Sequence, residues 1–158
     1  MALNERKFPG AARRGVATAL LAALSAYQVI LGLYFMFVRP SLLPEDLRAS
    51  ATTIDAVRGA APGLETWLGW VFAVLGGQMA ASGVLLAGAA FRVAYGQRPG
   101  KVDLASYGAA GLLSVALMSG VNFAIGSDFR WFLVAPVMLW LAVMITLGRR
   151  TSGGAPQS

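Results

Sequence analysis

This chain has 158 residues, of which 57% are hydrophobic and only 13% are charged. A soluble domain has about 45–50% apolar and about 25% charged residues, so the composition predicts an integral membrane protein. The sequence contains no cysteine and no histidine. Their absence excludes disulfides, thiolate nucleophiles, histidine-ligated haem and the usual zinc and copper sites, so we expect no cofactor and no metal site.

The net charge of +6 comes from basic residues in short segments beside apolar runs. Basic residues in such positions set membrane topology and contact anionic lipid headgroups. We therefore expect the lipid bilayer, and not nucleic acid, to be the partner of these charges.

Residues 1–15 form a basic segment, and an apolar run over residues 16–38 follows it. This run is longer than the roughly 7–15 apolar residues of a cleavable signal peptide. It therefore predicts a first transmembrane span that is retained, with residues 1–15 as its cytoplasmic anchor. Arg39-Pro40 ends the span, because a residue that precedes proline is disfavoured in helical geometry.

The connection that follows is the longest stretch outside the predicted spans, and its apolar residues recur at helical spacing. They are Leu43, Leu47, Ala51, Ile54, Val57 and Ala61. Charged and polar residues fall on the other side of the same helix. The pattern predicts one external amphipathic helix over about residues 45–60, lying in the membrane interface or folded over the outer mouth of the bundle.

The second span, residues 67–91, contains no charged side chain. At about 1.5 Å per residue it is long enough to cross a hydrocarbon core of about 30 Å. Small residues follow one another at four-residue spacing along it: Gly69, Ala73, Gly77 and Ala81. Because small residues let helix backbones approach closely in lipid, we expect this ridge to pack against other spans.

Two further spans are predicted at residues 104–125 and 131–147, with a short turn over 126–130 between them. Such a short turn makes the two spans antiparallel neighbours. Pro136 lies inside the fourth span and predicts a kink there. Residues 149–158 are rich in Gly, Ser and Pro after two arginines, and we expect a disordered cytoplasmic tail.

Together these segments predict an all-α integral membrane protein. Its transmembrane domain, residues 16–148, is a four-helix bundle with one external helix between the first two spans. With the N-terminus inside, nine basic residues lie in inner segments and four in outer segments. This bias predicts a multi-pass protein of a bacterial-type inner (plasma) membrane with both termini cytoplasmic.

Four polar residues within the spans are candidates for a polar interior: Gln28, Gln78, Ser119 and Asn122. Uncompensated amides are costly in hydrocarbon, so these side chains should face the bundle. They could make structural interhelical hydrogen bonds, or they could line a site for a ligand. No Asp, Glu, Lys or Arg lies within a span, which argues against ion-coupled transport.

A second candidate site is a charge cluster at the outer face, made of Glu65, Asp128 and Arg130. Carboxylates beside arginine could act on a lipid-linked substrate. The same residues at helix ends also serve as caps and rim ion pairs. We expect Arg130 to pair with Glu65 or Asp128, and no spacing here matches a catalytic motif.

The leading functional hypothesis is a non-catalytic accessory or structural subunit of the inner membrane. It would form a homo-oligomer or join a larger membrane complex through its small-residue helix faces. One alternative is binding or passage of a small neutral or lipid-like molecule through a polar interior. A second alternative is a membrane enzyme that acts on a lipid-linked substrate at the outer interface.

Overall fold

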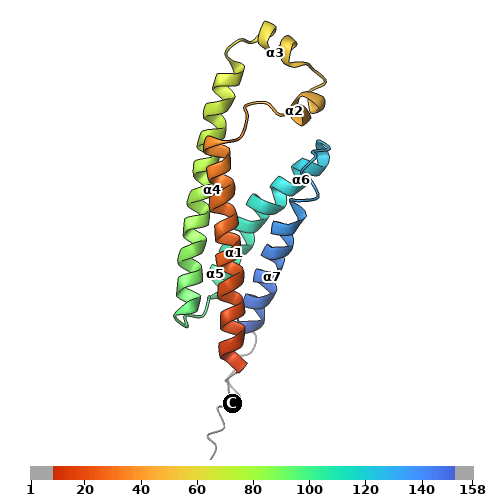
Figure 1. Ribbon diagram of the computed structural model, residues 1–158. Helices are drawn as coiled ribbons and strands as arrows, with labels where there is room; N and C mark the ends of the chain where they lie inside the picture. The colour runs from red at the N-terminus through yellow and green to blue at the C-terminus, as the bar shows by residue number, and fades with distance from the viewer. Residues whose placement is uncertain (1–8, 152–158) are drawn as a thin grey trace, which may run out of the picture.

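The computed structural model describes residues 9–151, and every regular element in that range is helical (Figure 1). In chain order the elements are α1 (Pro9–Phe37), α2 (Pro44–Ala49), α3 (Ile54–Ala60), α4 (Leu64–Ala94), α5 (Lys101–Gly111), the π-helical segment η1 (Leu112–Ala116), α6 (Leu117–Ala124) and α7 (Val134–Thr151). The segments α5, η1 and α6 follow one another without a break and form one long rod.

Within residues 9–151, three helical segments are long and apolar enough to cross a membrane. They are residues 11–37 of α1, the whole of α4, and the rod Lys101–Ala124. The predicted all-helical class, with long apolar helices that could span a membrane, is confirmed to this extent. The fourth predicted span corresponds to α7, which is apolar but shorter.

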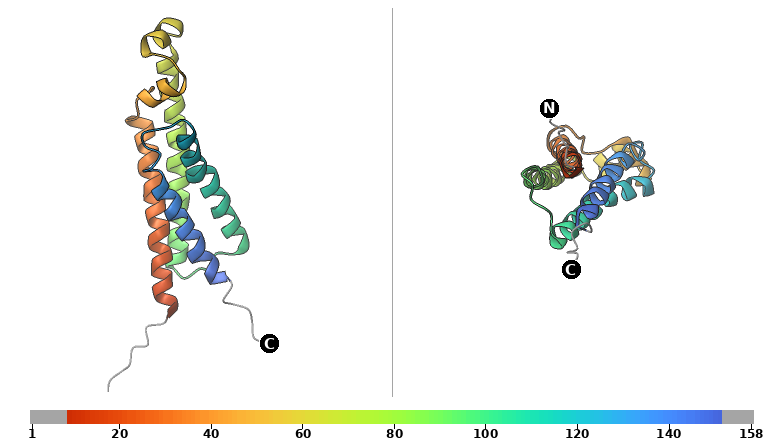
Figure 2. Two further views of the ribbon diagram at one scale, coloured as in Figure 1. Left: turned by 90° about the vertical axis from the view of Figure 1, so that its right-hand side faces the viewer. Right: turned by 90° about the horizontal axis from the view of Figure 1, so that it is seen from below.

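Helices α1 and α4 lie side by side along most of their length (Figures 1 and 2). Glycines allow this contact: a Cβ on Gly32 would lie 2.5 Å from the main-chain nitrogen of Ala80. A Cβ on Gly83 would lie 2.8 Å from the main-chain nitrogen of Val29. The Ser25 hydroxyl donates a hydrogen bond of 2.8 Å to the Gly83 carbonyl across the same seam. Only glycine fits at these positions without a backbone shift.

Part of the predicted ridge of Gly69, Ala73, Gly77 and Ala81 lies away from this contact. A Cβ on Gly77 would meet no atom within 4 Å, and Ala81 is exposed. On α4, the backbone approaches α1 closely at Gly76 and Gly83 instead. Helix α4 carries small residues on more than one face, so their spacing could not identify the face that meets α1.

The single amphipathic helix predicted over residues 45–60 is in fact two short helices, α2 and α3. Ala51, just after α2, has φ of 50°, the left-handed conformation that ends many helices. Its N–H donates to Arg48 O, and the Thr52 N–H donates to Leu47 O, which completes a Schellman cap. Thr53 then opens α3, where its hydroxyl accepts a hydrogen bond from the Ala56 N–H. Ala51 does not predict a helix end in the sequence, because glycine usually occupies this left-handed position.

Helix α7 packs against α1 and α5, and the buried core lies where these helices meet. Leu21, Val115, Val143 and Leu147 are almost fully buried there. Pro136 lies in the first turn of α7 and not in its middle. In the first turn of a helix the backbone N–H groups have no helical acceptor. A proline there removes no hydrogen bond, so Pro136 starts the helix and does not kink it.

Candidate functional site

Gln28 is a buried amide well inside α1, only 3% exposed. It lies about 14 Å from the outer end of the helix at about 1.5 Å per residue. Its Nε2 donates a hydrogen bond of 3.1 Å to the Ser114 hydroxyl oxygen. That hydroxyl donates its own proton to the Ala110 carbonyl, at 2.6 Å. Ser114 can therefore only accept from Gln28, which fixes the orientation of the amide.

In the described residues Gln28 makes its hydrogen bond through Nε2, and its carbonyl oxygen Oε1 accepts none. Oε1 is not among the fully buried polar atoms that lack a partner, which are Thr18 Oγ1 and Tyr27 OH, so it is not enclosed by protein. The Oε1 atom is therefore an acceptor available to a molecule beside it.

The segment η1, which carries Ser114, is a π-helical interruption of the rod between α5 and α6. Single π turns inside α-helices are rare and occur frequently at functional sites. Here the wider turn carries Leu113, Ser114 and Val115, three residues that line one cavity.

That cavity has a volume of about 450 Å³ and lies between α1, α4, the rod and α7. Its polar lining is limited to Gln28, Ser82, Ser106, Tyr107, Trp140 and Ser114, and most of its surface is apolar. Small-molecule sites have volumes of about 300–1,000 Å³, mostly apolar walls and a few polar groups that fix orientation. The cavity has these features, and we call it the Gln28 pocket.

The Gln28 pocket has a buried floor and an exposed mouth. Leu21 and Val143 on the floor are 0% and 1% exposed, whereas Leu85 of α4 and Leu113 of η1 are 77% and 70% exposed. Helix α4 makes no extensive contact with α5 or η1. The view from below in Figure 2 shows α4 and the start of α5 apart, with α1 beside α4 and α7 beside α5. The pocket therefore opens sideways, between α4 and the rod.

The four predicted interior residues do not form one site. Gln78 is exposed, and its main-chain carbonyl accepts a hydrogen bond from Ser82. Asn122 donates to the Met118 carbonyl within its own helix, and Ser119 is buried but does not line the pocket. Gln28 alone of the four lines the pocket.

Ser25 and Ser114 are the buried-site residues that the sequence did not single out. Ser25 joins the α1–α4 seam, and Ser114 orients Gln28. A serine inside a span often bonds to a carbonyl one turn back, so neither residue stands out in the sequence. The position of Ser114 also depends on the π turn, for which the sequence pattern offers no signal.

The outer-face residues Glu65, Asp128 and Arg130 are not gathered. Glu65 forms an ion pair of 3.2 Å with Arg58, and Asp128 forms one of 2.9 Å with Arg48. Arg130 donates instead to the Ser127 carbonyl, at 3.4 Å. The predicted pairing of Arg130 with Glu65 or Asp128 is therefore wrong. Arg48 of α2 and Arg58 of α3 pair with the two acids instead.

Two buried interactions of α2 tie the outer ends of the helices together. The Ser127 hydroxyl, fully buried in the α6–α7 turn, donates to the Glu45 carboxylate at 3.0 Å. Arg39, at the end of α1, pairs with Asp46 at 3.0 Å. Its guanidinium lies 3.7 Å from the centre of the Phe72 ring of α4. Through these contacts, the charged residues of α2 and Arg39 have a structural role: they connect α2 to α1, α4 and the α6–α7 turn.

Comparison of the chain with protein-family models, with curated proteins and with solved structures finds no match.

Proposed function

We propose that this chain is a non-catalytic membrane protein that binds a small neutral or lipid-like molecule in the Gln28 pocket. The observation that carries the proposal is an apolar cavity lined by Gln28, whose amide oxygen Oε1 accepts no hydrogen bond from the described residues. Apolar walls favour an apolar ligand, and one fixed acceptor provides orientation.

Two other hypotheses have less support. The enzyme hypothesis requires acids and an arginine in one cleft, and Glu65, Asp128 and Arg130 each bind other groups. Passage through the bundle requires polar groups at successive depths of one cavity, but Gln78 and Asn122 do not line the pocket. Binding from the membrane side agrees better with this geometry.

Filling the pocket should remove the bound molecule. Ala110 lines the pocket, and its exposed neighbour Ala109 does not. We expect wild type and Ala109→Trp, purified in mild detergent, to retain a defined neutral species that mass spectrometry detects in solvent extracts. Ala110→Trp should lose it, because the indole occupies the cavity. Identical extracts from all three proteins would contradict the proposal.

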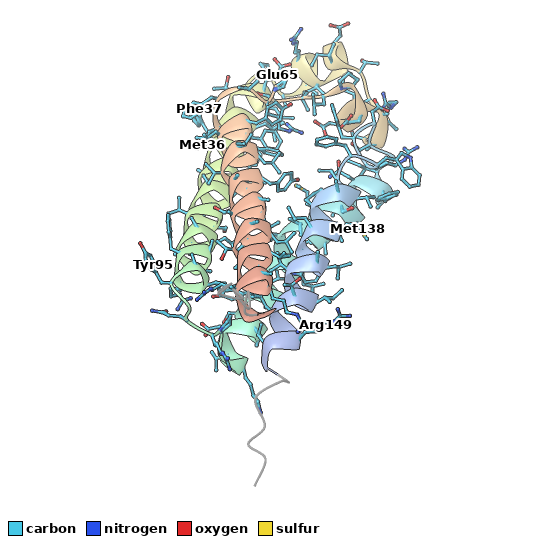
Figure 3. All side chains as sticks on the ribbon, turned by 60° about the horizontal axis from the view of Figure 1, so that its bottom comes forward. Met36, Phe37, Glu65, Tyr95, Met138 and Arg149 are labelled. Atoms are coloured by element: carbon cyan, nitrogen blue, oxygen red, sulfur yellow. The ribbon has the colours of Figure 1, made fainter. Side chains whose placement is uncertain are left out.

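The proposal places four crossings in a bacterial-type inner membrane, with both termini cytoplasmic. The 18 residues of α7 extend about 27 Å at about 1.5 Å per residue, and the apolar Trp131, Phe132 and Leu133 precede them. Figure 3 supports the arrangement: Tyr95 and Arg149 lie toward one end of the bundle, and Glu65 lies at the other. The excess of basic residues at the end with Arg149 favours a cytoplasmic location for it.

Single cysteines test this topology, because the natural chain has none. We expect an impermeant thiol reagent on intact cells to label Ser50→Cys but neither Gln97→Cys nor Ser152→Cys. All three should react after the cells are permeabilised. Labelling of Ser152→Cys in intact cells would mean that α7 does not cross the membrane.

A second candidate function is assembly, as an accessory subunit, through the ridge of Gly69, Ala73, Gly77 and Ala81. Its support is that Gly77 has open space around it and Ala81 is exposed, so the α1–α4 seam does not use them. We expect Gly77→Leu to reduce the particle size measured by light scattering in mild detergent, or to remove a copurifying partner. An unchanged particle with no partner would contradict assembly through this ridge.

A further inference from the structure

The geometry points to a hydroxyl-bearing apolar molecule as the ligand of the Gln28 pocket, held by a hydrogen bond to Gln28 Oε1 and entering sideways from the bilayer between α4 and η1. This inference rests on the proposed binding function and adds the chemical class of the ligand and its route.

The hydrogen-bond chain decides which polar group the ligand must carry. The Ser114 proton is committed to Ala110, so Ser114 accepts from Gln28 Nε2, and Oε1 remains as a pure acceptor. A ketone or an ester carbonyl could accept from the second Nε2 hydrogen of Gln28, but it would leave Oε1 without a donor. A hydroxyl donates to Oε1 and carries no charge that would have to leave water.

Charge argues against the ionised alternatives. Among the residues that line the pocket there is no Asp, Glu, Lys or Arg. An ammonium or carboxylate ligand would therefore be buried without a counter-charge, which strongly disfavours its binding. Arg92 donates a hydrogen bond to the hydroxyl of the pocket-lining Tyr107, and its charge is paired with Asp103. The pocket thus favours a neutral ligand.

The route by which the ligand enters the Gln28 pocket follows from which of the lining residues are exposed. Leu85 and Leu113 flank the mouth and are mostly exposed, while Gln28 and Val143 at the floor are buried. With α4 and the rod in a bilayer, exposed leucines at this depth face lipid tails. A ligand dissolved in the membrane therefore reaches Oε1 without passing through water.

Two matched photoprobes test the inference: a diazirine-bearing decanol and the corresponding diazirine-bearing decane. The full-length protein in mild detergent is labelled with each probe, and the labelled peptides are mapped by mass spectrometry. We expect both probes to label the peptides containing Leu85 and Leu113. After correction for partition into detergent, decanol should reach half-labelling at about a fivefold lower concentration, as one net hydrogen bond predicts.

Gln28→Met removes the acceptor with little change in shape. We expect it to raise the half-labelling concentration of decanol about fivefold and to leave that of decane unchanged. Ser119→Ala removes a buried hydroxyl of the same rod outside the pocket and should keep the wild-type preference. Should Gln28→Met fail to fold, Gln28→Leu and the wild-type comparison of the two probes decide the question.

The outcomes separate the two claims. Equal labelling by both probes in wild type would overturn the hydroxyl assignment and leave binding of an apolar molecule intact. A decanol preference that survives Gln28→Met would show that another group provides the acceptor. Labelling of the pocket by neither probe would overturn this inference and the proposed function together.

Discussion

Gly83→Ala lowers the thermal stability of the purified protein, whereas Gly77→Ala on the same helix leaves it unchanged or raises it. This is the expected result of adding one methyl group at two positions of α4 that differ only in what surrounds them. At Gly83 the new Cβ would lie 2.7 Å from Val29 Cγ2 and 2.9 Å from the Ser25 carbonyl. At Gly77 it would meet nothing within 4 Å.

The two effects have opposite signs because alanine favours a helix over glycine by about 1 kcal/mol. Gly77→Ala receives only this benefit. Gly83→Ala must also separate two backbones or strain the seam, which costs about 1–3 kcal/mol and breaks the approach on which the Ser25 hydrogen bond depends. We expect a net loss of about 1 kcal/mol, measured by thermal or denaturant unfolding in one detergent.

Gly76→Ala should behave like Gly83→Ala, since its Cβ would meet the Gly32 carbonyl oxygen and the main chain of Met36. Gly88→Ala, with open space, should behave like Gly77→Ala. Equal stability of Gly83→Ala and Gly77→Ala would show that α1 and α4 do not pack closely at Gly83.

The long apolar runs made much of this fold predictable. The predicted second span, residues 67–91, lies inside the observed α4, Leu64–Ala94, because an uncharged run of that length has few other solutions in a membrane protein. Two helix ends were also visible in the sequence. Gly96 and Gly126 have φ of 86° and 66° after α4 and α6, as glycine commonly does after the last helical residue.

Three features could not be read from the same sequence, each for a physical reason. Ala51 adopts the conformation that glycine usually takes, so α2 ends where the periodicity continues. The face of α4 that meets α1 depends on how Val29 and Met36 of the other helix fit over its glycines. The π turn at η1 depends on packing, and Ser114 reaches Gln28 only because of it.

The candidate site was also only partly predictable from the sequence. Gln28 was identifiable because a lone amide in a long apolar run must find a partner or a cavity. Its partner was not, since that partner is Ser114, while Gln78, the amide in the second predicted span, is exposed. Depth along a helix follows from residue number, but the direction of a side chain also requires the rotation of each helix about its axis.

Arg39→Ala is expected to destabilise the protein by about 3 kcal/mol, far more than removal of the other outer arginines. The Arg39 side chain is only 9% exposed, and its Nη2 lies 3.0 Å from Asp46 Oδ2. Its guanidinium also lies over the Phe72 ring. Removing one partner of a buried ion pair leaves the other charge uncompensated and costs about 3–5 kcal/mol. We take the lower end because Asp46 is 26% exposed and also accepts a hydrogen bond from the Leu43 N–H.

Arg48→Ala is the matched control, because Arg48 also forms an ion pair with an aspartate, Asp128, but at a solvent-exposed position. These two side chains are 55% and 67% exposed, so solvent screening should reduce the loss to about 0.5 kcal/mol or less. Arg39→Lys should fall between the two variants, since it keeps the charge and loses the flat stacking surface on Phe72. Denaturant unfolding in one detergent measures all three.

A double-mutant cycle then assigns the loss to the ion pair. The variant with both Arg39→Ala and Asp46→Ala should be more stable than the sum of the two single losses predicts, because it leaves no unpaired charge. Equal losses in Arg39→Ala and Arg48→Ala would mean that Arg39 is as solvated as the rim arginines. In that case α2 would not be fastened to the ends of α1 and α4, and only the hydrogen bond from Ser127 to Glu45 would remain as a buried connection between α2 and the helical bundle.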